Sequence, residues 1–160
     1  MNIRTLEDIE RLEMLEELIL ELHDLSDTGA IIVVEGRKDV ESLRSLGVNG
    51  EIKLSSQQSL LVFTEQLSMC GKDIVLLTDW DRKGSMAARK IIDYLHAYGI
   101  VPNTDIRAKI GFLVKKRSRI LKVSAGISGN SGMNCTARIN NFENPKNFET
   151  ATFLKVFIQL

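Results

Sequence analysis

Two short apolar runs, each followed within four residues by acidic side chains, most constrain what this chain can fold into. The runs are IIVV at 31–34 and IVLL at 74–77, and neither contains a polar position. A strand that is apolar on both faces is typical of a parallel sheet covered by helices on either side. Helical apolar spacing and glycine stops follow each run. The sequence therefore predicts an α/β domain with an open, mainly parallel sheet.

The other expected elements alternate with these strands. A short helix is expected from Gly36 to near Gly47, a more exposed strand in GEIKLSS at 50–56, a helix in residues 57–71 and a long helix from about Gly84 to Tyr98. Strand, helix, strand, helix, strand, helix is the order of a sheet built from right-handed crossovers.

An amphipathic helix is expected before the first strand. Its apolar residues recur at three- and four-residue steps, and nine acidic residues fill the other faces of residues 7–27. This pattern favours a helix that packs on the body of the domain. The alternative is an oligomer seam, through which the chain would bind a second copy or another protein. The apolar residues are Leu6, Ile9, Leu12, Leu15, Ile19, Leu22 and Leu25.

Three carboxylates follow the two apolar strands. Glu35 comes directly after the first strand, and Asp79 and Asp81 follow the other. If the strands are neighbours, these side chains lie within a few ångströms of one another at the rim where ligands of open α/β sheets bind. Crowded carboxylates repel unless a cation or proton joins them, and Mg²⁺ prefers oxygen ligands. Any one of these acids could instead be a helix N-cap or a turn former.

Structural roles are expected for four nearby residues. Asp39 stands where it can cap the helix after Gly36 or offset its dipole. Gly36 and Gly84 are expected to allow sharp backbone turns, although close approach of a phosphate would require the same residue. Trp80, between the two aspartates, is expected to be a core anchor rather than a surface for base stacking.

The segments VVEGRKD at 33–39 and LLTDWDRKG at 76–84 resemble the paired signature of the Toprim domain. The similarity extends over about residues 29–99 and is greatest to small stand-alone Toprim proteins of archaea. It implies a Rossmann-like Toprim fold over residues 29–116, with Glu35 as general acid or base and Asp79 and Asp81 as magnesium ligands. Gly36 and Gly84 match the accompanying glycines.

The resemblance implies phosphodiester hydrolysis dependent on Mg²⁺, or on Mn²⁺, with RNA slightly preferred over DNA as substrate. Four flanking cations are expected to hold the nucleic-acid backbone, or else to form a solvated basic rim. These cations are Arg37, Lys38, Arg82 and Lys83. The alternative function is a non-catalytic Toprim module that binds nucleic acid or protein.

Other enzyme classes fit the sequence poorly. A topoisomerase needs a nucleophilic tyrosine in a separate domain, whereas Tyr94 and Tyr98 lie in the predicted long helix. A primase would need zinc-binding and polymerase neighbours. Phosphatases of the haloacid dehalogenase type also place D-x-D after a strand, but they use the first strand and continue to Thr or Val where this chain has Lys83.

The last part of the chain differs chemically from the rest. Residues 1–116 hold 15 basic and 19 acidic residues, whereas residues 117–160 hold 6 and 2. The interpretations of residues 117–160 are a poorly ordered tail, a phosphate-binding segment and an altered C-terminus produced by a shifted reading frame. The expected domain organisation is therefore an N-terminal helix at residues 1–28, the Toprim domain at 29–116 and the tail at 117–160.

The compartment is predicted from what the sequence lacks. Cys70 and Cys135 are far apart, and His23 and His96 are isolated, so neither a zinc site nor a disulfide framework is indicated. No apolar run approaches the length of a membrane span. We therefore expect a cytoplasmic protein with no membrane partner.

Overall fold

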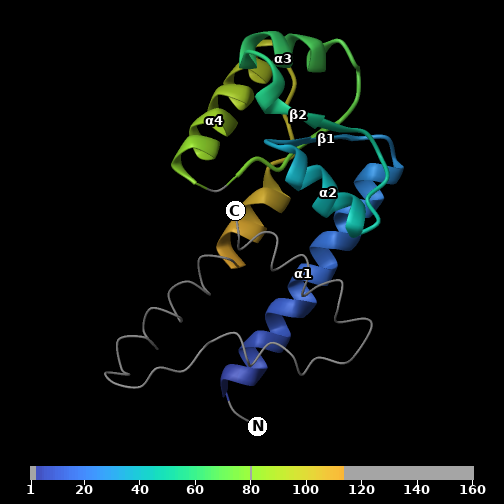
Figure 1. The fold of residues 1–160 in the computed structure, drawn as a ribbon, viewed down its shortest axis with the longest axis vertical. Helices are drawn as coiled ribbons and strands as arrows, with labels where there is room; N and C mark the ends of the chain where they lie inside the picture. The colour runs from blue at the N-terminus through green and yellow to red at the C-terminus, as the bar shows by residue number, and fades with distance from the viewer. Residues whose placement is uncertain (1–2, 80, 114–160) are drawn as a thin grey trace.

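Three parallel strands form the centre of the computed structural model, which describes residues 3–79 and 81–113 (Figure 1). They are β1 (Ile31–Val34), β2 (Ile52–Leu54) and β3 (Ile74–Leu76), in the order β2-β1-β3. Val33 pairs with Lys53 on one side and with Leu76 on the other. The two apolar strands are therefore neighbours, and the predicted α/β class is confirmed.

Helices connect the strands in the predicted order. They are α1 (Ile3–Asp27), α2 (Arg37–Ser45), α3 (Leu60–Ser68) and α4 (Arg82–Ala97), with a 3-10 turn η1 (Ser55–Gln57) before α3. A further helix includes residues 105–113. Just before it, Asn103 forms an isolated parallel bridge with Val75, so the chain returns along the outer edge of β3.

Successive residues of β1 face opposite sides of the sheet, and this alternation creates two cores. Ile31 and Val33 pack with residues of α3 and α4, including Phe63, Leu67, Ile91 and Leu95. Ile32 and Val34 pack with α1, α2 and the 105–113 helix, through residues that include Leu22, Leu43, Ile106 and Ile110. The sheet is therefore covered on both faces, as an all-apolar strand requires.

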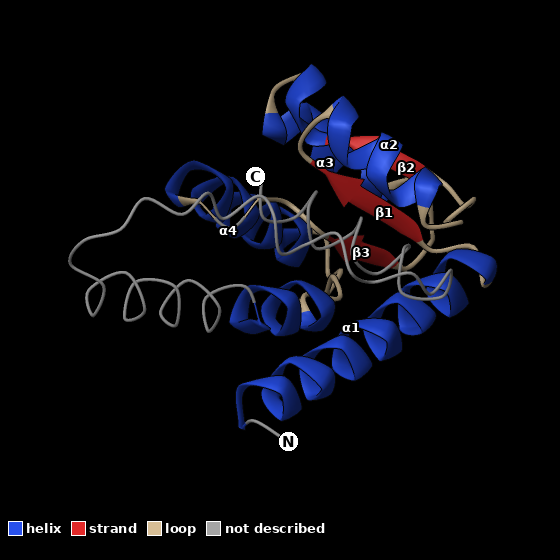
Figure 2. Ribbon diagram, turned by 60° about the horizontal axis from the view of Figure 1, so that its bottom comes forward, coloured by secondary structure: helices blue, strands red, loops and turns tan. Residues whose placement is uncertain are grey.

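Helix α1 packs on the domain through its C-terminal half. Leu15, Leu18 and Leu22 are buried, whereas Ile9 and Leu20 are exposed. The N-terminal end of α1 projects beyond the sheet (Figures 1 and 2). The predicted N-terminal helix is confirmed, and its buried leucines among the described side chains face the core beneath the sheet. Among the described residues of 3–113, no helix is long and apolar enough to cross a membrane.

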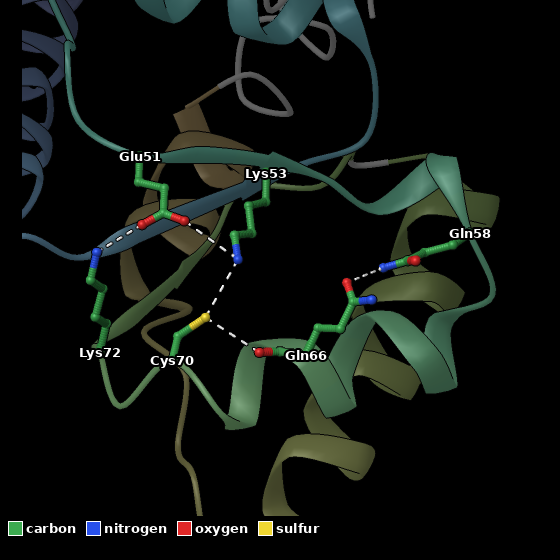
Figure 3. A network of polar contacts seen from close by, with 6 residues as sticks. All are labelled: Glu51, Lys53, Gln58, Gln66, Cys70 and Lys72. Atoms are coloured by element: carbon green, nitrogen blue, oxygen red, sulfur yellow. Dashed lines mark hydrogen bonds and ion pairs between the residues drawn. The ribbon is translucent and has the colours of Figure 1, made fainter.

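A polar network joins the start of β2 to the segment that precedes β3. Glu51 forms ion pairs with Lys72 at 2.8 Å and Lys53 at 3.4 Å, and Lys53 Nζ lies 3.4 Å from the Sγ of Cys70 (Figure 3). Hydrogen bonding to Lys72 is the largest effect on Glu51 and lowers the pKa of its carboxyl. The network therefore links the segments that lead into β2 and β3. Cys70 is a free thiol in this structure, and Cys135 lies outside the described residues.

Candidate metal centre

Four carboxylates come from different elements that meet at the carboxyl end of the sheet. Glu35 directly follows β1, and Asp79 lies three residues beyond β3. Asp39 belongs to the first turn of α2, and Asp81 is the N-cap of α4. Because β1 and β3 are parallel neighbours, the segments that follow the two strands leave the sheet on the same side. We call Glu35, Asp39, Asp79 and Asp81 the carboxylate cluster.

The Asp79 carboxyl is partly buried among the other acids of the cluster. Burial is the largest effect and, together with the negative charges of Asp39, Glu35 and Asp81, it raises the pKa of the Asp79 carboxyl to about 6. A hydrogen bond with Glu35 contributes in the same direction, because a proton on Asp79 can be shared with that carboxylate. Desolvation and like charges both favour the neutral acid. The residues predicted to converge therefore do influence one another, and Asp39 acts with them.

Two oxygen atoms of the cluster are buried and lack a hydrogen-bond partner. They are Oε2 of Glu35 and Oδ1 of Asp39. The other oxygen of Asp39, Oδ2, accepts a hydrogen bond from the backbone N–H of Gly36 at 2.8 Å. Asp39 thus has the predicted capping role at α2, but only one of its oxygens is used there. A buried acceptor without a donor is costly, and a bound cation is one kind of ligand that satisfies such oxygens.

Asp81 serves a different purpose in this structure. It is exposed, and its Oδ1 accepts a hydrogen bond from the backbone N–H of Gly84, which caps α4. Over the described ranges 3–79 and 81–113, no three acidic, histidine or cysteine side chains are arranged to hold a metal ion as they stand. The donor set is therefore chemically suited to Mg²⁺, but binding would require the carboxylates to draw together.

The predicted phosphate-binding cations lie at the starts of α2 and α4, the two helices that also carry Asp39 and Asp81. Arg37 and Lys38 are exposed in the first turn of α2, and Arg82 is exposed at the start of α4. Lys83 Nζ lies 3.8 Å from Oε1 of Glu35, with the lysine side chain 86% exposed. An ion pair this exposed contributes little to stability. These side chains remain available to an anionic ligand.

The two glycines differ in what they require. A Cβ at Gly84 would lie 2.5 Å from the carbonyl oxygen of Asp79, so only glycine lets α4 begin this close to that residue. Gly36 has a φ of −131°, and a Cβ there would be 3.7 Å from Asp39 Oδ2, an ordinary contact. Close approach explains Gly84, whereas the backbone at Gly36 does not depend on glycine. Trp80 lies outside the described residues.

Arg107 is a site residue that the sequence did not reveal. From the 105–113 helix its guanidinium donates to the carbonyl oxygens of Thr78 at 3.0 Å and Asp79 at 2.7 Å, and to the hydroxyl of Ser85 at 3.3 Å. It therefore fixes the backbone that carries Asp79. Nothing in the local sequence distinguishes Arg107 from a surface cation, because its partners lie 28 and 29 residues earlier.

Comparisons with known proteins agree with this architecture. The family model of the Toprim domain matches residues 30–113. A UPF0292 protein of Methanosarcina barkeri is 44% identical over 106 residues, which are 66% of this chain and 74% of that relative. A UPF0292 protein of Archaeoglobus fulgidus is 37% identical over 122 residues, covering 73% and 92% of the two chains.

A solved structure has the same fold. It is a protein from Aquifex aeolicus that is 25% identical, with a TM-score of 0.54 over 64% of this chain and 90% of the other. The predicted resemblance to small archaeal proteins of this type is confirmed by the two archaeal relatives. The chain therefore belongs to the Toprim domain family, and this membership indicates a metal-binding role associated with nucleic acids.

Proposed function

We propose that this protein hydrolyses phosphodiester bonds in nucleic acid in a reaction that depends on Mg²⁺ or Mn²⁺. The observation that supports it is the carboxylate cluster, in which two buried oxygens lack donors and the pKa of Asp79 is raised to about 6. Such an arrangement is unfavourable without a cation. The preference for RNA over DNA follows from the Toprim resemblance alone.

Asp79 and Asp81 would hold the ion, with Glu35 and Asp39 supplying the two unpartnered oxygens. A divalent cation bound there would neutralise a phosphodiester and stabilise negative charge on its oxygens. Asp81 would contribute the oxygen that is not engaged with Gly84. Arg107 would keep the Asp79 backbone fixed while the side chains adjust.

Glu35 is the proposed general acid or base. Hydrolysis forms a bond between a water oxygen and phosphorus and breaks one ester bond, so a proton must leave the water and another must reach the departing oxygen. The Glu35 carboxylate is only partly exposed and faces both Asp79 and the Lys83 ammonium. This position supports the proposal that Glu35 accepts or donates one of these protons. Arg37, Lys38, Arg82 and Lys83 would contact the phosphates on either side.

The second candidate is a binding module without chemistry, in which the ion joins the protein to nucleic acid or to another protein. The observation that favours it is the position of Asp81, which caps α4. A carboxylate committed to a cap has a structural reason to be present without catalysis.

The test is to incubate the purified chain with end-labelled RNA and DNA, single-stranded and folded, with Mg²⁺, Mn²⁺ or a chelator. Glu35→Gln and Asp79→Asn are compared with Asp73→Asn, an exposed acid at the other end of β3. Metal-dependent cleavage by the wild type and by Asp73→Asn, lost in the two cluster variants, supports hydrolysis. If every substrate stays intact while some are retarded on a gel, the binding module is the better account.

A further inference from the structure

A shallow groove lies beside the carboxylate cluster, between the start of α3 and the first half of α4. It has a volume of about 430 Å³ and is lined by Leu60, Arg82, Lys83, Met86, Ala87 and Lys90. Helices α3 and α4 lie side by side above the sheet (Figure 1). We call this the α3–α4 groove.

We propose that the α3–α4 groove binds an unpaired nucleic-acid strand and leads it to the carboxylate cluster. This inference rests on the proposed function, because that function makes the carboxylate cluster the site to which the bound strand leads. Its ligand is the sugar-phosphate backbone of a single strand together with at least one exposed base.

The charge of the groove complements a phosphate backbone. Three of its lining side chains are cations and none is acidic. Along α4, four cations precede the first acidic residue, Asp93, in the sequence RKGSMAARKIID. This concentration contrasts with residues 1–116 as a whole, where acids outnumber bases 19 to 15. A localised basic stripe is the usual footprint of nucleic acid on a protein that is not basic overall.

The groove is also continuous with the cluster. Lys83 lines it, and the same Nζ lies 3.8 Å from Oε1 of Glu35. Lys90 is seven residues further along α4, which is about 10 Å along the helix axis at 1.5 Å per residue. A strand that contacts both lysines therefore runs along α4 and ends beside the proposed general acid or base.

The apolar part of the lining favours an unpaired strand over a duplex. Met86 is 57% exposed and stands between the two lysines, and Leu60 contributes apolar surface from α3. The bases of a single strand can turn outward and lie on such a surface, whereas the bases of a duplex are already stacked and paired. Met86 therefore gives the basic groove an apolar surface on which a base can lie.

The experiment measures binding of a fluorescent single strand and of the matching duplex by anisotropy, in chelator and again with Ca²⁺, across a series of salt concentrations. Lys90→Ala should weaken single-strand binding about fivefold and reduce the slope of log K against log salt by about 0.7. Lys90→Arg should restore most of the affinity. The matched control is Lys72→Ala, because Lys72 is exposed and precedes β3, at the end of the strand opposite to the carboxylate cluster. This variant should leave the slope unchanged.

Met86→Ala tests the choice between single strand and duplex. It should lower single-strand affinity roughly threefold while duplex affinity stays the same. The proposal is overturned if Lys90→Ala and Lys72→Ala weaken binding equally, or if Met86→Ala lowers the affinity for single strand and duplex alike. It is also overturned if the wild type binds no single strand. Because binding is measured without turnover, a protein that passes these tests but cleaves nothing would refute hydrolysis and leave the groove standing.

Discussion

The guanidinium of Arg107 holds the backbone of Asp79, with Nη2 2.7 Å from the Asp79 carbonyl oxygen. Its Nε donates to Thr78, the residue before, at 3.0 Å. Burial lowers the pKa of Arg107, and the negative charge of Asp79 opposes that effect. One side chain thus satisfies two successive carbonyl oxygens just after β3. This contact orients Asp79, whose pKa is raised by burial and by the other acids of the cluster.

Replacing Arg107 should therefore disturb both stability and the metal site. Arg107→Ala leaves two carbonyl oxygens without their donor and should lower the free energy of unfolding by about 1–3 kcal/mol in urea titration. It should also reduce the rise in melting temperature produced by Mg²⁺. The control is Lys109→Ala on the same helix, whose exposed ion pair with Glu21 at 3.4 Å should be worth less than about 1 kcal/mol. Equal losses in the two variants would contradict a specific role for Arg107.

Alanine at the two glycines of the site should have unequal effects. Gly84→Ala places a Cβ 2.5 Å from the Asp79 carbonyl oxygen and 2.7 Å from its Cβ, so α4 must shift, at a cost of roughly 1–3 kcal/mol. Gly36→Ala meets only an ordinary contact and should cost no more than about 1 kcal/mol, as an N-cap replacement. Urea unfolding of the pair measures the difference. If Gly36→Ala were the more damaging, close approach at Asp79 would not be what requires glycine.

Asparagine and alanine substitutions of Asp81 should separate capping from charge. The Asp81→Asn side chain retains an oxygen that can accept from the Gly84 N–H, so this variant should keep the stability of the wild type in chelator. Asp81→Ala should lose about 1 kcal/mol. Both variants should show a weaker increase in melting temperature with Mg²⁺, because the stabilisation by a ligand decreases as its affinity for the folded state decreases. A full Mg²⁺ response in Asp81→Asn would exclude Asp81 as a ligand.

The fold was predictable because its main signals are local. The unbroken apolar runs at 31–34 and 74–77 indicate buried parallel strands, and the structure pairs them directly. The positions of Glu35 and Asp79 follow from that pairing, since each comes just after a strand whose carboxyl end lies at the same edge.

The finer features of the site depend on contacts between distant segments. Asp39 matches a helix-capping position, and only the fold shows that its second oxygen is buried beside other acids. Arg107 reaches back across 28 residues to Asp79, a distance over which periodicity carries no information. The boundary of α4 also moved, from the expected Gly84 to Arg82, because Asp81 caps the helix.

The raised pKa of Asp79 gives the metal-free protein a characteristic pH dependence. The folded carboxyl titrates at about 6, against 3.8 for the ordinary group, so between these values the folded chain binds more protons than the unfolded chain. Stability contributed by this group is therefore present at about pH 4 and is lost as pH rises through 6. In chelator, Asp79→Asn should remove that loss and be the more stable protein at pH 7.5, while Asp73→Asn should follow the wild type. Urea unfolding from pH 4 to 8 measures this difference, and a wild-type curve parallel to that of Asp79→Asn would contradict crowding of the carboxylates around Asp79.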